Sequence, residues 1–303
     1  MVAMAEGFDF DTKEFKQTAS CRNAPRITSD ILMSESRIQP HPLSVRHIGA
    51  VNWIGFWTLY SKEVRRFLKV WGQTVFAPMV TMLLFLAIFT LALGGAVRTV
   101  GDIPFVQFLA PGLIMMAIVQ NSFANTSSTI MVAKIQAVIV DVLMPPLTSL
   151  ELVTAFALGG MTRGLVVGIS VTLAMSFFVP LEIVHFWAVL FFAVSGSLML
   201  SLMGLIAGVW ADKFDHMAVI TNFVITPLAF LSGTFYSVEK LPGIWRTISS
   251  FDPFFYMIDG FRYGFIGAAD DSPVLGVVVM LGMNAALGWI AFELFRRGYK
   301  IKA

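Results

Sequence analysis

The sequence has few of the residues that enzymes and metal sites use. It contains one cysteine, Cys21, in 303 residues, which excludes an intrachain disulfide and a multi-cysteine metal site. Its four histidines show no H-E-x-x-H spacing, and no G-x-S-x-G motif occurs. The stretch that combines carboxylates with an imidazole, DKFDH at 212–216, is expected to be a solvated turn. We therefore predict neither an enzyme nor a metal site.

Charged residues are also scarce. They make up 13% of the chain against 57% hydrophobic residues, and the mean hydropathy is +0.77. This composition lies outside the range of soluble domains and predicts a polytopic integral membrane protein. The net charge is only +2, and Lys and Arg are concentrated outside the apolar runs rather than in a stripe, so no nucleic-acid partner is expected.

The amino-terminal segment, residues 1–50, lacks an apolar run. It is polar, carries Pro25, Pro40 and Pro42, and has no core of the kind that a cleavable signal peptide needs. We expect it to be a disordered cytoplasmic tail, and Met33 is a candidate for the natural start. Residues 51–303 are expected to form one transmembrane domain.

About six apolar segments are long enough to cross a bilayer, whose core needs about 20 helical residues. They lie near 75–93, 105–133, 152–178, 184–209, 217–236 and 274–295. An even number of spans places both termini on one side. The basic runs KEVRRFLK and RRGYKIK flank the first and last spans, so the positive-inside rule predicts cytoplasmic termini. The predicted fold class is an all-α integral membrane protein.

A helix in the cytoplasmic interface is predicted before the first span. In the run NWIGFWTLYSKEVRRFLKVWGQTVF, aromatic and aliphatic residues recur every three or four positions. The opposite face carries Lys62, Arg65, Arg66 and Lys69. Aromatic side chains suit the headgroup layer and basic side chains face anionic lipid. The helix is a membrane anchor in one interpretation and also docks a cytoplasmic partner in the other.

The segment KIQAVIVDVLMPPLTSLEL, at 134–152, lies between the second and third spans and is therefore predicted to be cytoplasmic. One apolar face of a short helix is formed by Ile135, Val138, Ile139, Val142 and Leu143. Lys134 lies off this face, and Pro145 and Pro146 end the helix. Thr148 and Glu151 then form a capping box that starts the third span. A plain turn between spans is the other interpretation.

Polar residues also occur inside the spans. A stripe on the second span and a pair in the fifth span are formed by Gln120, Asn121, Asn125, Ser128 and Thr129, and by Asn222 and Thr226. Pro227 predicts a kink beside the pair. The stripe either bonds neighbouring helices or lines a pathway for a polar or amphiphilic substrate. Both hold in a dimer whose second spans face each other.

Arg163 is the charged residue within the third predicted span. A charge is costly at the bilayer centre. We expect Arg163 to snorkel to the cytoplasmic headgroups, and contact with substrate near the midplane is the alternative.

The segment from Ser237 to Ser272 is too polar to span and too apolar for an ordinary loop. Helices are predicted to start at Pro242 and at Asp252. We expect two short re-entrant helices on the extracytoplasmic side. They form a structural lid, or an extracytoplasmic gate around Tyr256 and Tyr263.

The run FLAPGLIMMAIVQNSFANTSSTIMVAKIQAVIVDVLMPPLTSLELV is followed by GGMTRGLVVG, FLSGTFYSVEKLP and DPFFYMIDGFRYGFIG. From about Trp53 onward this order resembles the membrane-spanning permease subunit of bacterial ABC type-2 transporters. The resemblance implies six spans, an interfacial helix, a cytoplasmic coupling helix and short extracytoplasmic helices. It implies that the coupling helix contacts an ATPase through Lys134, Ile135, Val138, Ile139, Val142, Pro145 and Pro146.

The sequence has no G-x-x-x-x-G-K-[ST] loop, so ATP and Mg²⁺ are expected on a separate ATPase subunit. The expected partners are that ATPase, a second copy of the chain and membrane lipid. The resemblance implies a bacterial inner-membrane exporter of an amphiphilic, lipid-linked, saccharide or drug-like substrate. An ion-coupled secondary transporter is the alternative, although no long internal repeat supports it. A scaffold for a cytoplasmic enzyme is a third possibility.

Overall fold

The computed structural model describes residues 49, 51–93, 99–100, 103–236, 238, 243–244, 249 and 251–300. The predicted tail, including Met33, lies outside these residues apart from Gly49. The fold below is that of the unit from Ile48 onward.

Helix α1 (Trp53–Leu68) is amphipathic, as predicted. It begins at Asn52, whose side chain accepts a hydrogen bond from the Gly55 amide at 3.0 Å. Trp53 and Trp57 are exposed, whereas Phe67 is buried. The predicted aromatic face is therefore divided between the protein interior and the surface.

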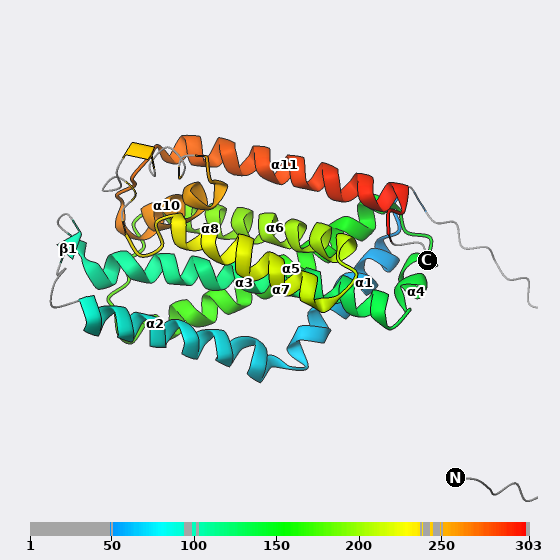
Figure 1. The fold of residues 1–303 in the computed structure, drawn as a ribbon, viewed down its shortest axis with the longest axis horizontal. Helices are drawn as coiled ribbons and strands as arrows, with labels where there is room; N and C mark the ends of the chain where they lie inside the picture. The colour runs from blue at the N-terminus through cyan, green and yellow to red at the C-terminus, as the bar shows by residue number, and fades with distance from the viewer. Residues whose placement is uncertain are drawn as a thin grey trace, which may run out of the picture. The chain divides into compact units, whose positions relative to one another are not determined.

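Six helical segments of the described chain are long and apolar enough to cross a membrane, and each overlaps a predicted span. They are η2 (Gly72–Phe76) with α2 (Ala77–Leu93), α3 (Phe105–Ile135), α5 (Ser149–Ser176), α6 (Phe186–Trp210), α7 (Phe214–Ile220) with η3 (Thr221–Ile225) and α8 (Thr226–Leu231), and α11 (Pro273–Arg297). Figure 1 shows them running roughly along one direction. The all-α membrane architecture is confirmed.

Helix α3 is at the centre of the bundle. Of its most apolar stretch 83% is buried, against 11% for the first span and 17% for the fifth. It packs against α5 and α6, and a Cβ at Gly160 or Gly204 would collide with side chains of the neighbouring helices. The described residues largely enclose this helix within one chain, which does not favour a dimer whose second spans face each other.

The fifth span is interrupted where a kink was predicted. A single wide π-helical turn, η3, comes directly before Pro227, which lies in the first turn of α8. The proline cannot donate a hydrogen bond to the preceding turn, which accounts for the interruption.

One end of the bundle carries α10 (Pro253–Ile266) and a small antiparallel pair, β1 (Thr99–Val100) and β2 (Ile103–Pro104) (Figure 1). Asp252 caps α10 by accepting from the Phe254 amide at 2.9 Å, as predicted. Most residues of the other predicted helix, from Pro242, lie outside the described residues. The opposite end carries α4 (Ile139–Leu143) and the last turn of α11.

Candidate functional site

The predicted helix over 134–143 is not continuous, so that prediction is wrong. Helix α3 extends to Ile135, and Ala137 has a positive φ of 57°. This left-handed conformation ends α3, and the short helix α4 starts again at Ile139. Lys134 and Ile135 therefore belong to the last turn of α3.

The break changes which apolar side chains face outward. Ile139 is buried and Val142 is half-buried, and both pack in the cluster that contains Leu59 and Phe156. The α4 patch, which is between 39% and 74% exposed, consists of Ile135, Val138, Val140 and Met144. The sequence interpretation missed the last two, because a continuous helix gives the wrong phase after Ala137.

The Lys134 side chain forms its polar contacts within the chain. Its Nζ donates to the carbonyl oxygens of Val209 at 2.9 Å and Ala211 at 2.6 Å, and lies 3.7 Å from Asp212. These hydrogen bonds satisfy backbone carbonyl groups at the carboxyl end of α6, where the helix dipole favours a cation. The hydrogen bond from Lys300 is the largest effect that lowers the pKa of the exposed Asp212 carboxyl. Lys134 is thus bonded within the chain, and its contact with an ATPase stays a prediction.

The capping box at the start of α5 is confirmed, and it also holds α1. One oxygen of Glu151 accepts from the Thr148 amide at 2.7 Å, and the other accepts from the Asn52 amide at 2.6 Å. The Asn52 side chain donates to the Pro146 carbonyl at 3.2 Å. One carboxylate therefore joins the start of α5, the start of α1 and the segment that follows α4.

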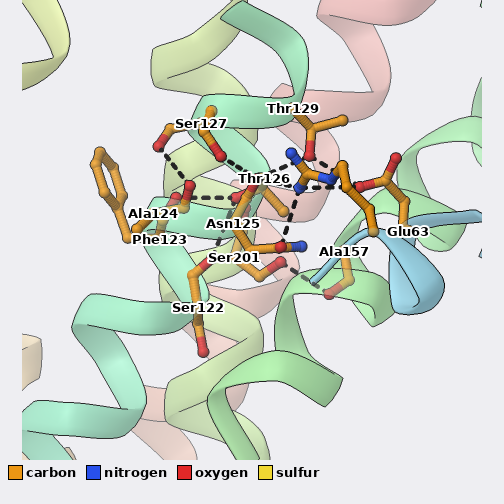
Figure 2. A network of polar contacts seen from close by, with 12 residues as sticks. Glu63, Ser122, Phe123, Ala124, Asn125, Thr126, Ser127, Thr129, Ala157 and Ser201 are labelled. Carbon is orange, nitrogen blue, oxygen red and sulfur yellow. Dashed lines mark hydrogen bonds and ion pairs between the residues drawn. The ribbon is translucent and has the colours of Figure 1, made fainter. Parts of the chain in front are cut away.

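A charged network joins the second half of α1 to α3 (Figure 2). Glu63 is 1% exposed, and its Oε2 accepts from Thr129 at 2.8 Å and lies 3.2 Å from Arg66. Arg66 donates to the backbone and side-chain oxygens of Asn125, both at 3.0 Å. Gly159 of α5 leaves room for Glu63, since a Cβ there would lie 2.8 Å from the Glu63 Cβ. The sequence interpretation missed Glu63. The only sign of its role in the sequence was that an acidic residue occurs within a basic run.

A neutral extension of this network joins α3, α5 and α6 (Figure 2). Thr126 donates to the Ser201 carbonyl at 2.8 Å, and Ser201 donates to the Ala157 carbonyl at 2.8 Å. Such bonds between helices contribute about 0.6 kcal/mol each. They hold the three central helices in one register.

The polar stripe of the second span is therefore divided. Asn121, Asn125 and Thr129 are buried and bonded to other helices, which supports the interhelical interpretation for them. Gln120 and Ser128 are half-buried and line a cavity of about 190 Å³ between α3 and the fifth span.

From the fifth span this cavity is lined by Phe214, Met217, Thr221 and Ile225. Asn222 is exposed and Thr226 is half-buried, and neither lines it. The structure therefore does not bring the two parts of the predicted pathway together at one cavity.

Arg163 lies near the middle of the 28-residue helix α5 and turns toward α3. It donates to the Asn121 side-chain oxygen at 3.3 Å, and its buried Nε has no hydrogen-bond partner among the described residues. The side chain points to α3 in this contact and does not extend toward the cytoplasmic headgroups as predicted. The side chain instead joins the polar stripe.

The two predicted gate tyrosines do not line a common opening. Tyr256 is 8% exposed and packs with Phe255 and Val238. The Tyr263 ring stacks on His185 at 4.4 Å between centroids, with its hydroxyl 3.4 Å from the His185 Nε2. Tyr263 therefore ties α10 to the segment that precedes α6.

Two charged residues of α10, which were not predicted, are buried. Asp259 accepts from the backbone amides of Asp270 at 2.9 Å and Asp271 at 3.1 Å, and burial raises the pKa of Asp259 to about 6. Arg262 donates to the Gly233 carbonyl at 2.6 Å and lies over the Phe108 ring at 3.8 Å. Burial lowers the pKa of Arg262. Their i, i+3 spacing was the only sequence signal.

The comparisons with known proteins agree with this architecture. The family described as ABC-2 type transporter matches residues 54–266. The inner membrane transport permease YadH of Escherichia coli strain K12 is 37% identical over 252 residues, which cover 83% of this chain and 98% of YadH. Nodulation protein J of Rhizobium leguminosarum bv. viciae is 26% identical over 247 residues, which cover 78% of this chain and 88% of that protein. The chain belongs to the ABC-2 type transporter family and is a membrane permease of that kind.

Proposed function

We propose that the chain is the permease subunit of an ATP-driven exporter. It works in the bacterial inner membrane as a pair of copies with a separate ATPase subunit, which binds ATP and Mg²⁺, and both of its termini are cytoplasmic. The name of YadH, an inner membrane transport permease, supports this location and role. The substrate is an amphiphilic, lipid-linked, saccharide or drug-like molecule.

The α4 patch is the observation that carries the proposal. It exposes four apolar side chains on a segment whose opposite side, at Ile139, is buried in the chain's own core. An amphipathic helix laid in a partner's groove is a known mode of recognition. Pro145 and Pro146 are also exposed beside it and belong to the same contact. The ATPase is the occupant that the family supplies.

Closure of the ATPase would reach the spans through contacts already described. Movement of α4 pulls on the Glu151 carboxylate, which holds both α5 and α1. Helix α1 then acts on α3 through the contact between Glu63 and Thr129. The proposed substrate path lies along Gln120, Ser128 and the exposed fifth span with Asn222 and Thr226, whereas the bonded members of the stripe position helices.

The α10 region is the proposed outer closure. Tyr263 bonds His185 and stacks on it, so α10 and the start of α6 would have to separate before substrate leaves. Tyr256, buried in the same helix, holds the inner side of this closure.

The test is purification of the tagged chain in mild detergent, followed by mass spectrometry of bound proteins and an ATPase assay. We expect a stoichiometric partner with a phosphate-binding loop. The double variant Val138→Asp with Val140→Asp should weaken its binding and substrate-stimulated ATPase by about tenfold or more, since loss of a central apolar anchor costs over 1 kcal/mol.

Val184→Asp is the matched control, because Val184 is equally exposed but lies near the α10 end. It should leave binding unchanged. A chain that purifies alone and moves substrate on an ion gradient in liposomes would instead establish the secondary-transporter alternative.

A further inference from the structure

Two arginine side chains bond to α3 where α1, α3 and α5 pack together. Arg66 donates to Asn125 and Arg163 donates to Asn121, and these two asparagines are about one helical turn apart on α3. Both guanidinium groups therefore donate to side chains on the same stretch of α3. Like charges held together in the interior of a membrane protein are costly unless a negative group accompanies them.

The described residues do not supply enough negative charge. Glu63 is the carboxylate of this network, and it is paired with Arg66 at 3.2 Å. No carboxylate among the described residues forms an ion pair with Arg163, and the Nε atoms of both arginines are buried without a hydrogen-bond partner there. In the described network one positive charge is left over, with three unpartnered donors, Arg66 Nε, Arg163 Nε and Asn125 Nδ2, and one unpartnered acceptor, Glu63 Oε1. A guanidinium fork with free donors suits a phosphate or carboxylate.

An open groove at the surface shares Arg66 with this network. It has a volume of about 810 Å³ and is lined by α1 residues, among them Trp57, Lys62, Arg65, Arg66 and Lys69. Arg66 belongs both to the groove and to the buried network. The exposed cations attract an anionic group, and the indole offers a surface for an apolar chain.

We propose that Arg66 and Arg163 form a binding site for the anionic headgroup, a phosphate or a carboxylate, of an amphiphile that enters by this groove. The amphiphile is either an anionic lipid of the surrounding membrane or the transported molecule itself. The second source rests on the proposed function and would make the substrate an anionic amphiphile. The first source does not depend on it.

The lipid source is tested by native mass spectrometry of the delipidated full chain. Phosphatidylglycerol and phosphatidylethanolamine are added separately and the bound lipid is counted. We expect the wild-type chain to prefer phosphatidylglycerol by about tenfold. Arg163→Gln should remove the preference, and Arg163→Lys should retain part of it. Inorganic phosphate should compete with phosphatidylglycerol on the wild-type chain, a test that needs no variant.

The substrate source is tested on the complex with the ATPase. Dodecyl phosphate should stimulate ATP hydrolysis, whereas uncharged dodecyl maltoside and cationic dodecyl trimethylammonium should not. Arg163→Gln should abolish the stimulation. Arg297→Gln is the matched control, because Arg297 is an exposed arginine paired with Glu293 on α11, and it should change neither readout.

Preference for phosphatidylglycerol without stimulation by dodecyl phosphate assigns the site to a resident lipid, and stimulation assigns it to the transported molecule. Equal binding of charged and uncharged amphiphiles by the wild-type chain, or an unchanged preference in Arg163→Gln, would overturn the inference. An intact, active ATPase complex in that case would leave the proposed function standing. Conversely, a chain without an ATPase partner that still selects phosphatidylglycerol would overturn the proposed function alone.

Discussion

Helices α4 and α10 lie at opposite ends of the bundle (Figure 1). Apolar side chains are exposed at the α4 end, whereas charged side chains are buried in α10. Val140 and Met144 have no covering side chains, but Asp259 and Arg262 are enclosed with hydrogen bonds to backbone groups. Exposed apolar surface at a membrane protein's aqueous end needs a partner, and buried charged groups that are held by hydrogen bonds resist separation. The first end is suited to binding and the second to closure.

Neighbouring residues of α4 give the largest expected contrast. Ile139→Asp places an unpaired charge in the core and should lower the free energy of unfolding by about 4 kcal/mol. Val140→Asp, one position along on the exposed side, should change it by less than about 0.5 kcal/mol. The thermal midpoint of the detergent-purified protein measures both. Equal losses of stability in the two variants would show that Val140 is buried in the purified protein even when no ATPase is bound.

Loss of the Glu63 carboxylate should have the next largest effect. Glu63→Ala leaves Arg66 and Thr129 without their shared partner, and breaking a buried ion pair costs about 3 kcal/mol or more. Glu293→Ala breaks an ion pair with the exposed Arg296 and Arg297 and should cost much less, because solvent screens such pairs. The thermal midpoints of the two variants measure the two losses of stability. A Glu63→Ala variant as stable as Glu293→Ala would show that the contact between Glu63 and α3 does not stabilise the fold.

The α10 end should respond to pH. The folded-state pKa of Asp259 is about 6, above its ordinary value of 3.8, so between pH 4 and 6 the folded chain binds more protons than the unfolded chain. The free energy of unfolding should therefore fall as pH rises through this window, by on the order of 2 kcal/mol. Burial also raises the pKa of Asp252, in the same direction.

Asp259→Asn isolates the contribution of the first carboxyl. Stability of this variant should vary less between pH 4 and 7 than that of the wild-type chain. An identical pH profile for both proteins would contradict the raised pKa.

Tyr263→Phe should have the smallest effect. It removes one hydroxyl, whose bond to His185 is long at 3.4 Å, but retains the ring stack. Stability should change by less than about 1 kcal/mol. If the α10 end closes the exit, transport in reconstituted vesicles should change more than stability. A variant with wild-type transport would confine Tyr263 to a structural role.

Local sequence patterns predicted several features well. The spans followed from runs of apolar residues, because a bilayer-length helix needs little else. The capping box at Thr148 and the cap at Asp252 also followed, because both depend on side chains within three residues of the helix start. The sequence could not show the break at Ala137, since a left-handed alanine has no local signature.

The sequence by itself determined the number of spans, the amphipathic α1 and the short segment between the second and third spans. Hydrophobicity and capping act over one or a few helical turns, so they can be recognised in the chain. The tertiary structure alone decided that Glu63 and Lys134 turn inward, that α3 is enclosed, and that Arg66 and Arg163 both bond to α3. Those outcomes depend on side chains brought together from distant positions, because a buried charge is placed by the partners that surround it.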